Sequence, residues 1–300
     1  MSASYTIKIK TELSPEIRQF FIGHGFEMGE APHALWRAKG PGCNVTFYTS
    51  GKLLLQGKEA DAWRGLLGDV TADARPYHAA LARHPRPQPL RWIGTDETGK
   101  GDYFGPLVVA GVSMVRDNIE ILQTLGVDDS KALSDSKVPE LAEGIRAVCQ
   151  TEVLLIGPEK YNALYERMGN LNRLMAWAHG RVIENLLERQ VEPRPDWILV
   201  DRFASDHLMK RALGPLGQKT RFDQWPKAES DPAVAAASIL ARAAFLRGIK
   251  NLSKRFGVQL RPGAGGPTLA SGRAFLQMHD ASALRQVAKL HFATTQQIGA

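Results

Sequence analysis

The chain has 300 residues, 44% of them hydrophobic, with 38 Lys and Arg against 31 Asp and Glu and a formal net charge of +7. This length and hydrophobic content are enough for a sizeable core in one large or two smaller domains. The surplus of basic residues is typical of a protein that binds a polyanion, although an ordinary basic protein can have it too. Two distant cysteines, an N-terminus without an apolar signal core and the absence of a membrane-length apolar run argue against a disulfide scaffold and a membrane span, so we expect a cytoplasmic protein.

The first 83 residues predict a small α+β unit. Residues 5–10 alternate between polar and apolar side chains, as expected of a half-buried strand. Ser14-Pro15 is expected to open a helix, with Ser14 as the N-cap and Pro15 in the first turn, where its missing N–H is harmless. Three further strands are expected at 35–39, 44–48 and 52–56, and a second helix at about 59–67.

Basic and aromatic side chains follow the strands of this unit. The basic ones are Lys8, Lys10, Arg37, Lys39 and Lys52, and the aromatic ones are Trp36, Phe47 and Tyr48. Such a surface can bind nucleic acid through phosphate contacts and through apolar contact with sugars and bases. Taken one at a time, the aromatic residues are expected instead to belong to the core and the lysines to a solvated face. We expect the unit as a whole to bind nucleic acid.

Residues 84–89, HPRPQP, interrupt the regular elements. Three prolines among polar residues forbid a helix and favour an extended spacer. The sequence therefore predicts a substrate-binding domain over residues 1–83, a proline-rich linker over 84–89 and a second, larger domain over 90–300.

The second part alternates strands with helices, which predicts an α/β architecture. A strand over 90–96 ends at two acids, and a β-branched run at 107–112 is expected to be its hairpin partner. A long amphipathic helix is expected at 170–189, and the apolar strand 197–200 delivers Asp201. The other expected elements are helices at 137–148 and 232–247, the latter buried, and a strand at 152–156.

Residues 94–106, GTDETGKGDYFGP, contain most of a phosphate-binding loop, G-x-x-x-x-G-K. Position 101 is Gly, so the hydroxyl that would hold Mg²⁺ is missing. A β-type run follows, and not the helix whose N–H groups would face the phosphates. Asp96 and Glu97 would also repel a polyphosphate. These features argue against a nucleotide-hydrolysing enzyme, which ATP turnover without nucleic acid would support.

Asp96 and Glu97 are better explained as metal ligands. Mg²⁺ and Mn²⁺ prefer carboxylate oxygens, and a bound metal relieves the repulsion between clustered acids. Asp201 after a second strand and Glu229 before a buried helix would complete the set of acids that a phosphodiester-cleaving site needs. Taken singly, Asp201 also suits a turn, and Glu229 suits an ordinary surface position.

These segments, in this order, resemble ribonuclease HIII, within the type 2 ribonucleases H. Motifs of that family match DETGKG at 96–101, DYFGP at 102–106, DSKAL at 129–133, YN at 161–162, NLNRL at 170–174, VDRF at 200–203, KAE at 227–229, AAASILAR at 235–242 and KLHF at 289–292. The resemblance covers the chain from about residue 92 onward. The front part, with YTSGK at 48–52 and QGK at 56–58, is similar to the TATA-binding-protein-like N-terminal domain of the family.

The resemblance implies a ribonuclease H-like catalytic domain, with a mixed sheet flanked by helices, that cleaves the RNA strand of an RNA/DNA hybrid. The four acids of the family correspond to Asp96, Glu97, Asp201 and Glu229. They would be the catalytic residues and the ligands of Mg²⁺ or Mn²⁺, two ions per site, with Asp96 as the bridging ligand. A glutamate as the fourth acid agrees with ribonuclease HIII and not with ribonuclease HII.

Substrate contacts are expected in the glycine-rich segment Gly99, Lys100 and Gly101. Glycines allow backbone groups to approach a 2′-hydroxyl in the shallow minor groove of the hybrid, and Lys100 suits a phosphate. Ser130 and Lys131 are expected either to contact substrate or to form a capped helix start.

The expected reaction is a two-metal phosphoryl transfer. An activated water attacks phosphorus and the leaving 3′-oxygen is stabilised, which gives 5′-phosphate and 3′-hydroxyl ends as the resemblance implies. We expect a monomer that acts on a hybrid duplex and not at a membrane. The alternatives are ribonuclease HII-like incision at a single ribonucleotide in duplex DNA and a non-catalytic nucleic-acid-binding protein.

Overall fold

The computed structural model describes residues 3–64, 91–127 and 134–300. The chain divides into two compact units, Met1–Ala79 and Ala80–Ala300. The predicted linker at 84–89 and the end of the predicted helix at 59–67 lie outside the described residues, as do Ser130 and Lys131.

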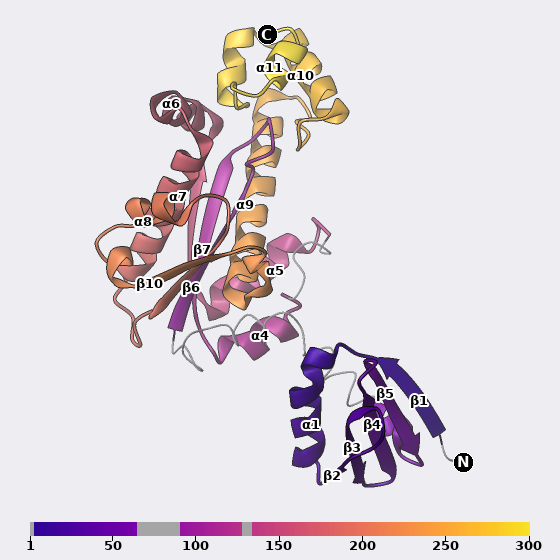
Figure 1. Cartoon of the computed structure of the whole chain (residues 1–300). Helices are drawn as coiled ribbons and strands as arrows, with labels where there is room; N and C mark the ends of the chain where they lie inside the picture. Colours follow the sequence, from indigo (N-terminus) through magenta and orange to yellow (C-terminus); the bar gives the residue numbers. More distant parts are fainter. Residues whose placement is uncertain (1–2, 65–90, 128–133) are drawn as a thin grey trace. The chain divides into compact units, whose positions relative to one another are not determined.

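The first unit is built on an antiparallel five-stranded sheet with the strand order β1-β5-β4-β3-β2 (Figure 1). The strands are β1 (Ala3–Lys8), β2 (Glu27–Gly29), β3 (Ala34–Gly40), β4 (Cys43–Tyr48) and β5 (Lys52–Gly57). Helix α1 (Ser14–Gly23) packs Ile17 and Phe21 onto one face of this sheet. The four predicted strands are confirmed, whereas β2 was not predicted because three residues carry too little alternation.

Ser14 does not cap α1, contrary to the sequence prediction. The turn Thr11–Leu13 runs directly into the helix, so Ser14 already has helical backbone angles (φ −56°, ψ −42°), whereas an N-cap needs an extended backbone. Its hydroxyl instead accepts a hydrogen bond from the indole Nε1 of Trp36, 2.9 Å away. Pro15 lies in the first turn of the helix, as predicted.

Trp36 and Phe47 lie in the core of the first unit, as the alternative interpretation of these aromatic residues expected, and so they take no part in a nucleic-acid platform. They are 5% and 0% exposed and pack on the face of the sheet that α1 covers. The alternation of the strands puts exposed Arg37 and Lys39, and half-buried Tyr48, on the opposite face. The sequence did not show which face α1 would cover, so it could not assign the aromatic residues to one side.

The second unit contains a mixed five-stranded sheet with the strand order β10-β9-β6-β7-β8. The strands are β6 (Arg91–Thr98), β7 (Leu107–Val115), β8 (Gln150–Ile156), β9 (Trp197–Asp201) and β10 (Arg221–Trp225). The central strand β6 pairs antiparallel with β7 and parallel with β9. All except β10 were predicted, and β10 was missed because its five residues, RFDQW, include two charged ones.

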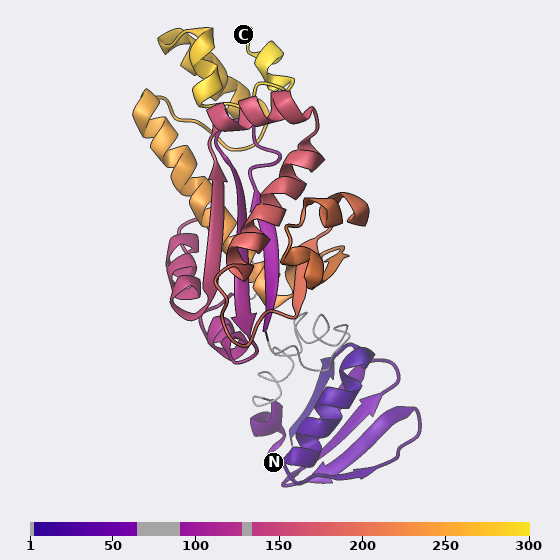
Figure 2. The same cartoon turned by 90° about the vertical axis from the view of Figure 1, so that its left-hand side faces the viewer.

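Helices cover both faces of this sheet (Figure 2). On one face lie α9 (Pro232–Phe256) and α5 (Val138–Val148), and on the other lie α7 (Leu171–Leu187) and α6 (Pro158–Met168). The other α-helices in the described part of this unit are α4 (Asn118–Thr124), α8 (Asp206–Ala212), α10 (Gly266–Met278) and α11 (Thr294–Gln297). The unit is therefore the predicted α/β fold with a mixed sheet between helices.

Helix α9 runs further than predicted. The expected helix ended at residue 247, but α9 continues to Phe256 and stops at Gly257, whose φ of 65° favours glycine. By length and composition alone α9 is apolar enough to cross a membrane. However, 67% of its most apolar window is buried inside the protein, as in the core helix of a globular domain.

The start of α9 lies directly against β6. Gly94 permits this contact, because a Cβ at that position would lie 2.4 Å from a backbone nitrogen of α9. Asp231 fixes the helix start by accepting hydrogen bonds from two amides of the first turn (2.8 and 3.2 Å) and from the indole of Trp92 on β6 (3.2 Å). The segment that carries Glu229 is thereby held next to the strand that carries Asp96.

Candidate active site

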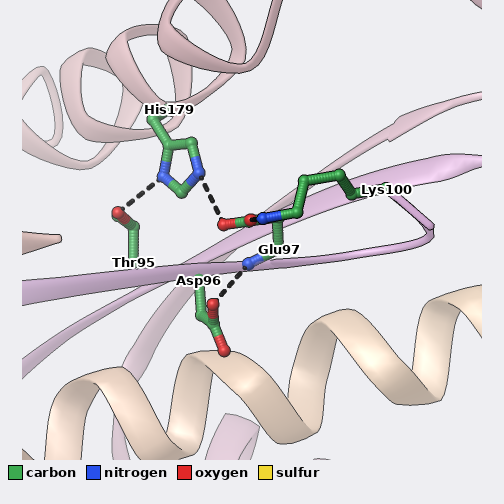
Figure 3. Close-up of polar contacts among 5 residues, drawn as sticks. All are labelled: Thr95, Asp96, Glu97, Lys100 and His179. Atoms are coloured by element: carbon green, nitrogen blue, oxygen red, sulfur yellow. Dashed lines mark hydrogen bonds and ion pairs between the residues drawn. The ribbon is translucent and has the colours of Figure 1, made fainter. Parts of the chain in front are cut away.

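The two neighbouring acids of β6 point to opposite faces of the sheet (Figure 3). Asp96 faces α9, where it forms a hydrogen bond with Ser238, and its Oδ1 accepts a bond from the backbone N–H of Glu97 at 2.8 Å. Glu97 faces α7, where its carboxylate contacts His179. The two-residue period of a strand requires this separation.

Asp201 and Glu229 approach Asp96 from two other elements. Strand β9 runs parallel to β6, and the register of the pair places Asp201, the last residue of β9, beside Asp96. Glu229 lies in the turn Ala228–Ser230 just before α9. Asp201 Oδ1 accepts a hydrogen bond of 2.9 Å from the backbone N–H of Ala228, which ties this turn to the end of β9.

Three of the four predicted acids line one pocket of about 410 Å³. The lining residues are Asp96, Thr98, Asp201, Lys227, Glu229, Ser238 and Arg242. No role was predicted for Lys227 and Arg242, although both lie in the segments KAE and AAASILAR. Lys227 has a left-handed backbone (φ 56°), which costs energy for a residue with a side chain and often marks a functional site. Glu97 does not line this pocket.

The acids of the pocket are only partly neutralised by the protein. Burial, followed by the charge of Glu97, raises the pKa of Asp96 to about 7, against hydrogen bonds from Ser238 and the Glu97 amide that lower it. Burial also raises the pKa of Asp201, and the charges of Glu229 and Glu97 add to this rise. Clustered carboxylates that repel one another in this way favour a divalent cation among them.

Glu97 is buried but ionised. Its side chain is 8% exposed; Oε1 accepts a hydrogen bond from Lys100 Nζ at 2.9 Å, and Oε2 accepts one from His179 Nε2 at 3.2 Å (Figure 3). Burial alone would raise its pKa, but the hydrogen bond and charge of His179, with the charge of Lys100, lower the pKa of Glu97 to about 2. His179 was not predicted as a functional residue, because a single histidine on an apolar helix face looks like a core residue.

The donor set of the pocket fits a hard divalent cation. Asp96, Asp201 and Glu229 supply only carboxylate oxygens, the ligands that Mg²⁺ and Mn²⁺ prefer. Within residues 3–64, 91–127 and 134–300, no group of three acidic, histidine or cysteine side chains is arranged to hold a metal ion as a ready-made cage. Mg²⁺ needs no such cage, because it keeps several waters and takes one or two carboxylates together with substrate phosphate.

The glycine-rich turn after β6 is fixed by close backbone contacts. Gly99 has a φ of 95°, and a Cβ there would lie 2.2 Å from the carbonyl oxygen of Pro106, so only glycine fits. Gly101 is exposed with open space around it, and the exposed Lys100 reaches back to the acids. The turn leads into β7 and not into a helix, so the structural requirement of a phosphate-binding loop is not met.

A buried lysine holds the end of this turn. Lys289 is 0% exposed, and its Nζ donates hydrogen bonds to the carbonyl oxygens of Asp102 and Gly105, both at 2.8 Å. Burial lowers the pKa of Lys289 to about 7. The carboxylate of Asp102 accepts a further bond from the N–H of Gly263 at 2.6 Å. The C-terminal segment therefore shapes the turn, a role that the KLHF segment did not reveal.

Comparison with known proteins gives consistent results. A Ribonuclease HII family model matches residues 93–295, and a domain of unknown function, DUF3378, matches residues 5–73. The chain is 36% identical to ribonuclease HIII of Chlamydia pneumoniae, covering 99% of each, and 36% identical to that of Protochlamydia amoebophila, covering 97% of this chain and 94% of the relative. It is similar to the crystal structure of Bst-RNase HIII in complex with Mn²⁺, with a TM-score of 0.71 and 32% identity, covering 99% of this chain and 98% of the other.

Proposed function

The chain belongs to the ribonuclease HIII family and is a ribonuclease H endonuclease. We propose that it cleaves the RNA strand of RNA/DNA hybrids at the pocket of Asp96, Asp201 and Glu229. The observation that carries the proposal is the meeting of these three carboxylates from three separate elements, one of them with its pKa raised to about 7. We further propose that the enzyme is a cytoplasmic monomer.

The residues that would hold the metal in this proposal are Asp96, Asp201 and Glu229, which line the pocket, and Glu97, which lies outside its lining but whose charge adds to the effect of burial on the pKa of Asp96 and Asp201. Mg²⁺ or Mn²⁺ bound there would activate the attacking water and stabilise the leaving 3′-oxygen, giving 5′-phosphate and 3′-hydroxyl ends. The protein supplies the orientation of the acids: backbone amides hold Asp96 and Asp201 at 2.8 and 2.9 Å. The similarity to a ribonuclease HIII crystallised with Mn²⁺ supports the choice of metal.

Cationic side chains near the acids suit the phosphates of the substrate. Lys227 and Arg242 line the pocket together with the acids, and Lys100 is bound to Glu97. Arg242 is also bound by Asp135 at 2.6 Å, which fixes its guanidinium. We assign these three cations to phosphates next to the scissile bond, because Lys and Arg at such positions both orient the strand and stabilise developing charge.

The glycine-rich turn is assigned to the RNA strand. Gly99 keeps its backbone in a conformation closed to other residues, and Gly101 leaves open space on the exposed side of the turn. Backbone groups there can reach a 2′-hydroxyl, the group that distinguishes RNA from DNA in the wide minor groove of a hybrid. Ser130 and Lys131 stay candidates for a further substrate contact.

The first unit is assigned to substrate binding through the open face of its sheet. Arg37 and Lys39 are exposed on this face, opposite the face that α1 covers. Replacing both with Ala in the full chain should weaken hybrid binding and reduce the slope of log affinity against log salt by up to about 2, since each phosphate contact contributes roughly 0.9. Arg18→Ala on exposed α1 is the matched control. An unchanged salt slope in the double variant would remove this assignment.

The main test is Asp96→Asn. Loss of this proposed metal-binding carboxylate should reduce hybrid cleavage by orders of magnitude, while the fold should stay intact because a neutral amide is easier to bury than a charged carboxylate. Asp206→Asn, on α8 outside the pocket, is the matched control and should cleave normally. Cleavage by Asp96→Asn at near wild-type rate would eliminate the assigned site.

A second assay separates the alternatives. A continuous RNA/DNA hybrid and a DNA duplex with one embedded ribonucleotide should be cleaved at different rates, with the hybrid preferred. Preference for the single ribonucleotide would favour ribonuclease HII-like activity. Binding of the hybrid without metal-dependent cleavage would indicate a non-catalytic binding protein.

A further inference from the structure

His179 connects α7 to strand β6 through a contact of each ring nitrogen (Figure 3). Its ring is 0% exposed and lies 3.2 Å from Glu97 Oε2 through Nε2 and 2.8 Å from Thr95 Oγ1 through Nδ1. The ring also stacks on Phe203 at a centroid distance of 5.0 Å and an interplanar angle of 24°. Both ring nitrogens and one ring face are thus engaged, which leaves the imidazole a single orientation.

The hydrogen-bond chemistry of this chain has a fixed direction. An ionised carboxylate only accepts hydrogen bonds, so Nε2 of His179 must carry the hydrogen that faces Glu97. The hydroxyl of Thr95 serves either state of the ring: it donates to Nδ1 of a neutral imidazole and accepts from Nδ1–H of a cation. Thr95 therefore secures a donor toward Glu97 whichever state the ring adopts.

The two oxygens of Glu97 are held in different ways. Oε2 is bound by the fully buried His179, whereas Oε1 is bound by Lys100, whose side chain is 47% exposed. An exposed lysine can turn away from the carboxylate, for example to bind a phosphate, and this frees Oε1 of Glu97 for an incoming cation. A buried and stacked histidine cannot move in this way. Glu97 is therefore anchored on its α7 side and exchangeable on the other.

We propose that His179, oriented by Thr95, is a positioning residue that holds Glu97 in the place and orientation needed for divalent metal binding. This inference rests on the proposed function, because it assigns Glu97 to the metal. A histidine with a purely structural role can bind a backbone group, as half-buried His279 does through Nε2 with the carbonyl of Phe256 at 2.8 Å. In His179 both partners are instead side chains of β6, at the two positions flanking Asp96.

The test compares His179→Leu, which removes both contacts, with His179→Gln, whose amide can still donate to Glu97. Titration of the full chain with MnCl₂ by calorimetry, without nucleic acid, should show about tenfold to a hundredfold weaker binding for His179→Leu. His179→Gln should recover most of this loss. In hybrid cleavage, kcat should fall with little change in KM at saturating Mn²⁺, because His179 has no contact with substrate in this proposal.

Two further variants keep the test decisive. Thr95→Val removes the hydroxyl at nearly constant volume and should weaken Mn²⁺ binding less than His179→Leu does, which tests the proposal even if His179→Leu does not fold. His279→Gln is the matched control and should leave Mn²⁺ binding unchanged.

Two results would be negative in different ways. A wild-type chain that binds Mn²⁺ and cleaves hybrid, with His179→Leu and Thr95→Val equal to it, overturns the role of His179 alone. A wild-type chain that neither binds Mn²⁺ nor cleaves hybrid overturns the proposed function.

Discussion

Asn162 on α6 fixes the C-terminal segment that supports the glycine-rich turn. Its Nδ2 donates hydrogen bonds to the carbonyl oxygens of Ala288 (2.8 Å) and Arg285 (3.2 Å), and its Oδ1 accepts one from the N–H of Leu290 (3.0 Å). Asn162 is 4% exposed. Lys289, which holds the turn after β6, lies in the chain between two of these partners, so Asn162 acts on the active site through it.

Asn162→Ala would leave three backbone groups of this segment without their partners. A buried group left unpaired costs about 1–3 kcal/mol, and water can reach the less buried of the three, so we expect a loss of about 3–5 kcal/mol in the free energy of unfolding. Asn185→Ala is the matched control. Its amide makes one partly exposed contact with the carboxylate of Glu152 at 3.0 Å, so we expect a loss of at most about 1 kcal/mol.

The assay is urea unfolding of the full chain followed by tryptophan fluorescence, with Trp92 and Trp197 reporting on the second unit. Hybrid cleavage measured well below the transition should show a higher KM for Asn162→Ala, because the displaced turn no longer presents Gly99 and Gly101 correctly. If the free energies of unfolding of Asn162→Ala and Asn185→Ala differ by less than about 1 kcal/mol, the three hydrogen bonds of Asn162 do not anchor the C-terminal segment.

Three other predictions follow from contacts in the second unit. Gly94→Ala would place a Cβ 2.4 Å from the backbone of α9. The substitution should lower the unfolding free energy by about 1–3 kcal/mol or more and should also reduce hybrid cleavage. Unchanged activity would show that the contact between β6 and α9 can relax. Burial lowers the pKa of Lys289 from 10.5 to about 7 in the folded protein, so between these pH values only the unfolded chain holds this proton. The contribution of Lys289 to stability therefore falls as the pH drops from about 10 to 7 and is constant below. The difference in unfolding free energy between the wild type and Lys289→Met should show this dependence on pH, and a constant difference would contradict it. The carboxylate of Glu184 accepts hydrogen bonds from two backbone N–H groups, at 2.8 and 3.1 Å. Glu184→Gln replaces one acceptor oxygen with an N–H₂ group, which leaves one of these N–H groups unpaired, so the melting temperature should fall while the kcat of the folded enzyme stays the same. An unchanged melting temperature would show that Glu184 does not stabilise the fold in this way.

Local sequence patterns predicted the elements that carry the acids. The apolar runs that became β6 and β9 have the length of strands and end at acidic residues, so both strands and their positions could be read directly. The end of α9 could not, because residues 248–256, GIKNLSKRF, mix apolar and basic side chains. Only their packing and the left-handed Gly257 show that the helix continues through them.

Tertiary packing decided what the sequence left open. Trp36 alternates with basic residues in β3 and Phe47 with polar ones in β4, and helix α1 is the element that covers the face of the sheet to which both aromatic side chains point. Glu97 and His179 are 82 positions apart in the chain, so their contact depends on α7 lying across β6. No local pattern encodes such a contact.

Burial alone does not distinguish a catalytic acid from a structural one in this protein. Asp231 and Glu184 are 0% and 7% exposed, and both accept hydrogen bonds mainly from backbone N–H groups. Burial raises the pKa of Asp231 to about 6, with no contribution from another acid. For Asp96, the carboxylates of Glu97 and Asp201 add to the effect of burial. The site is therefore marked by acids that repel one another, a property that arises only where β6, β9 and the start of α9 meet and that a bound divalent cation would relieve.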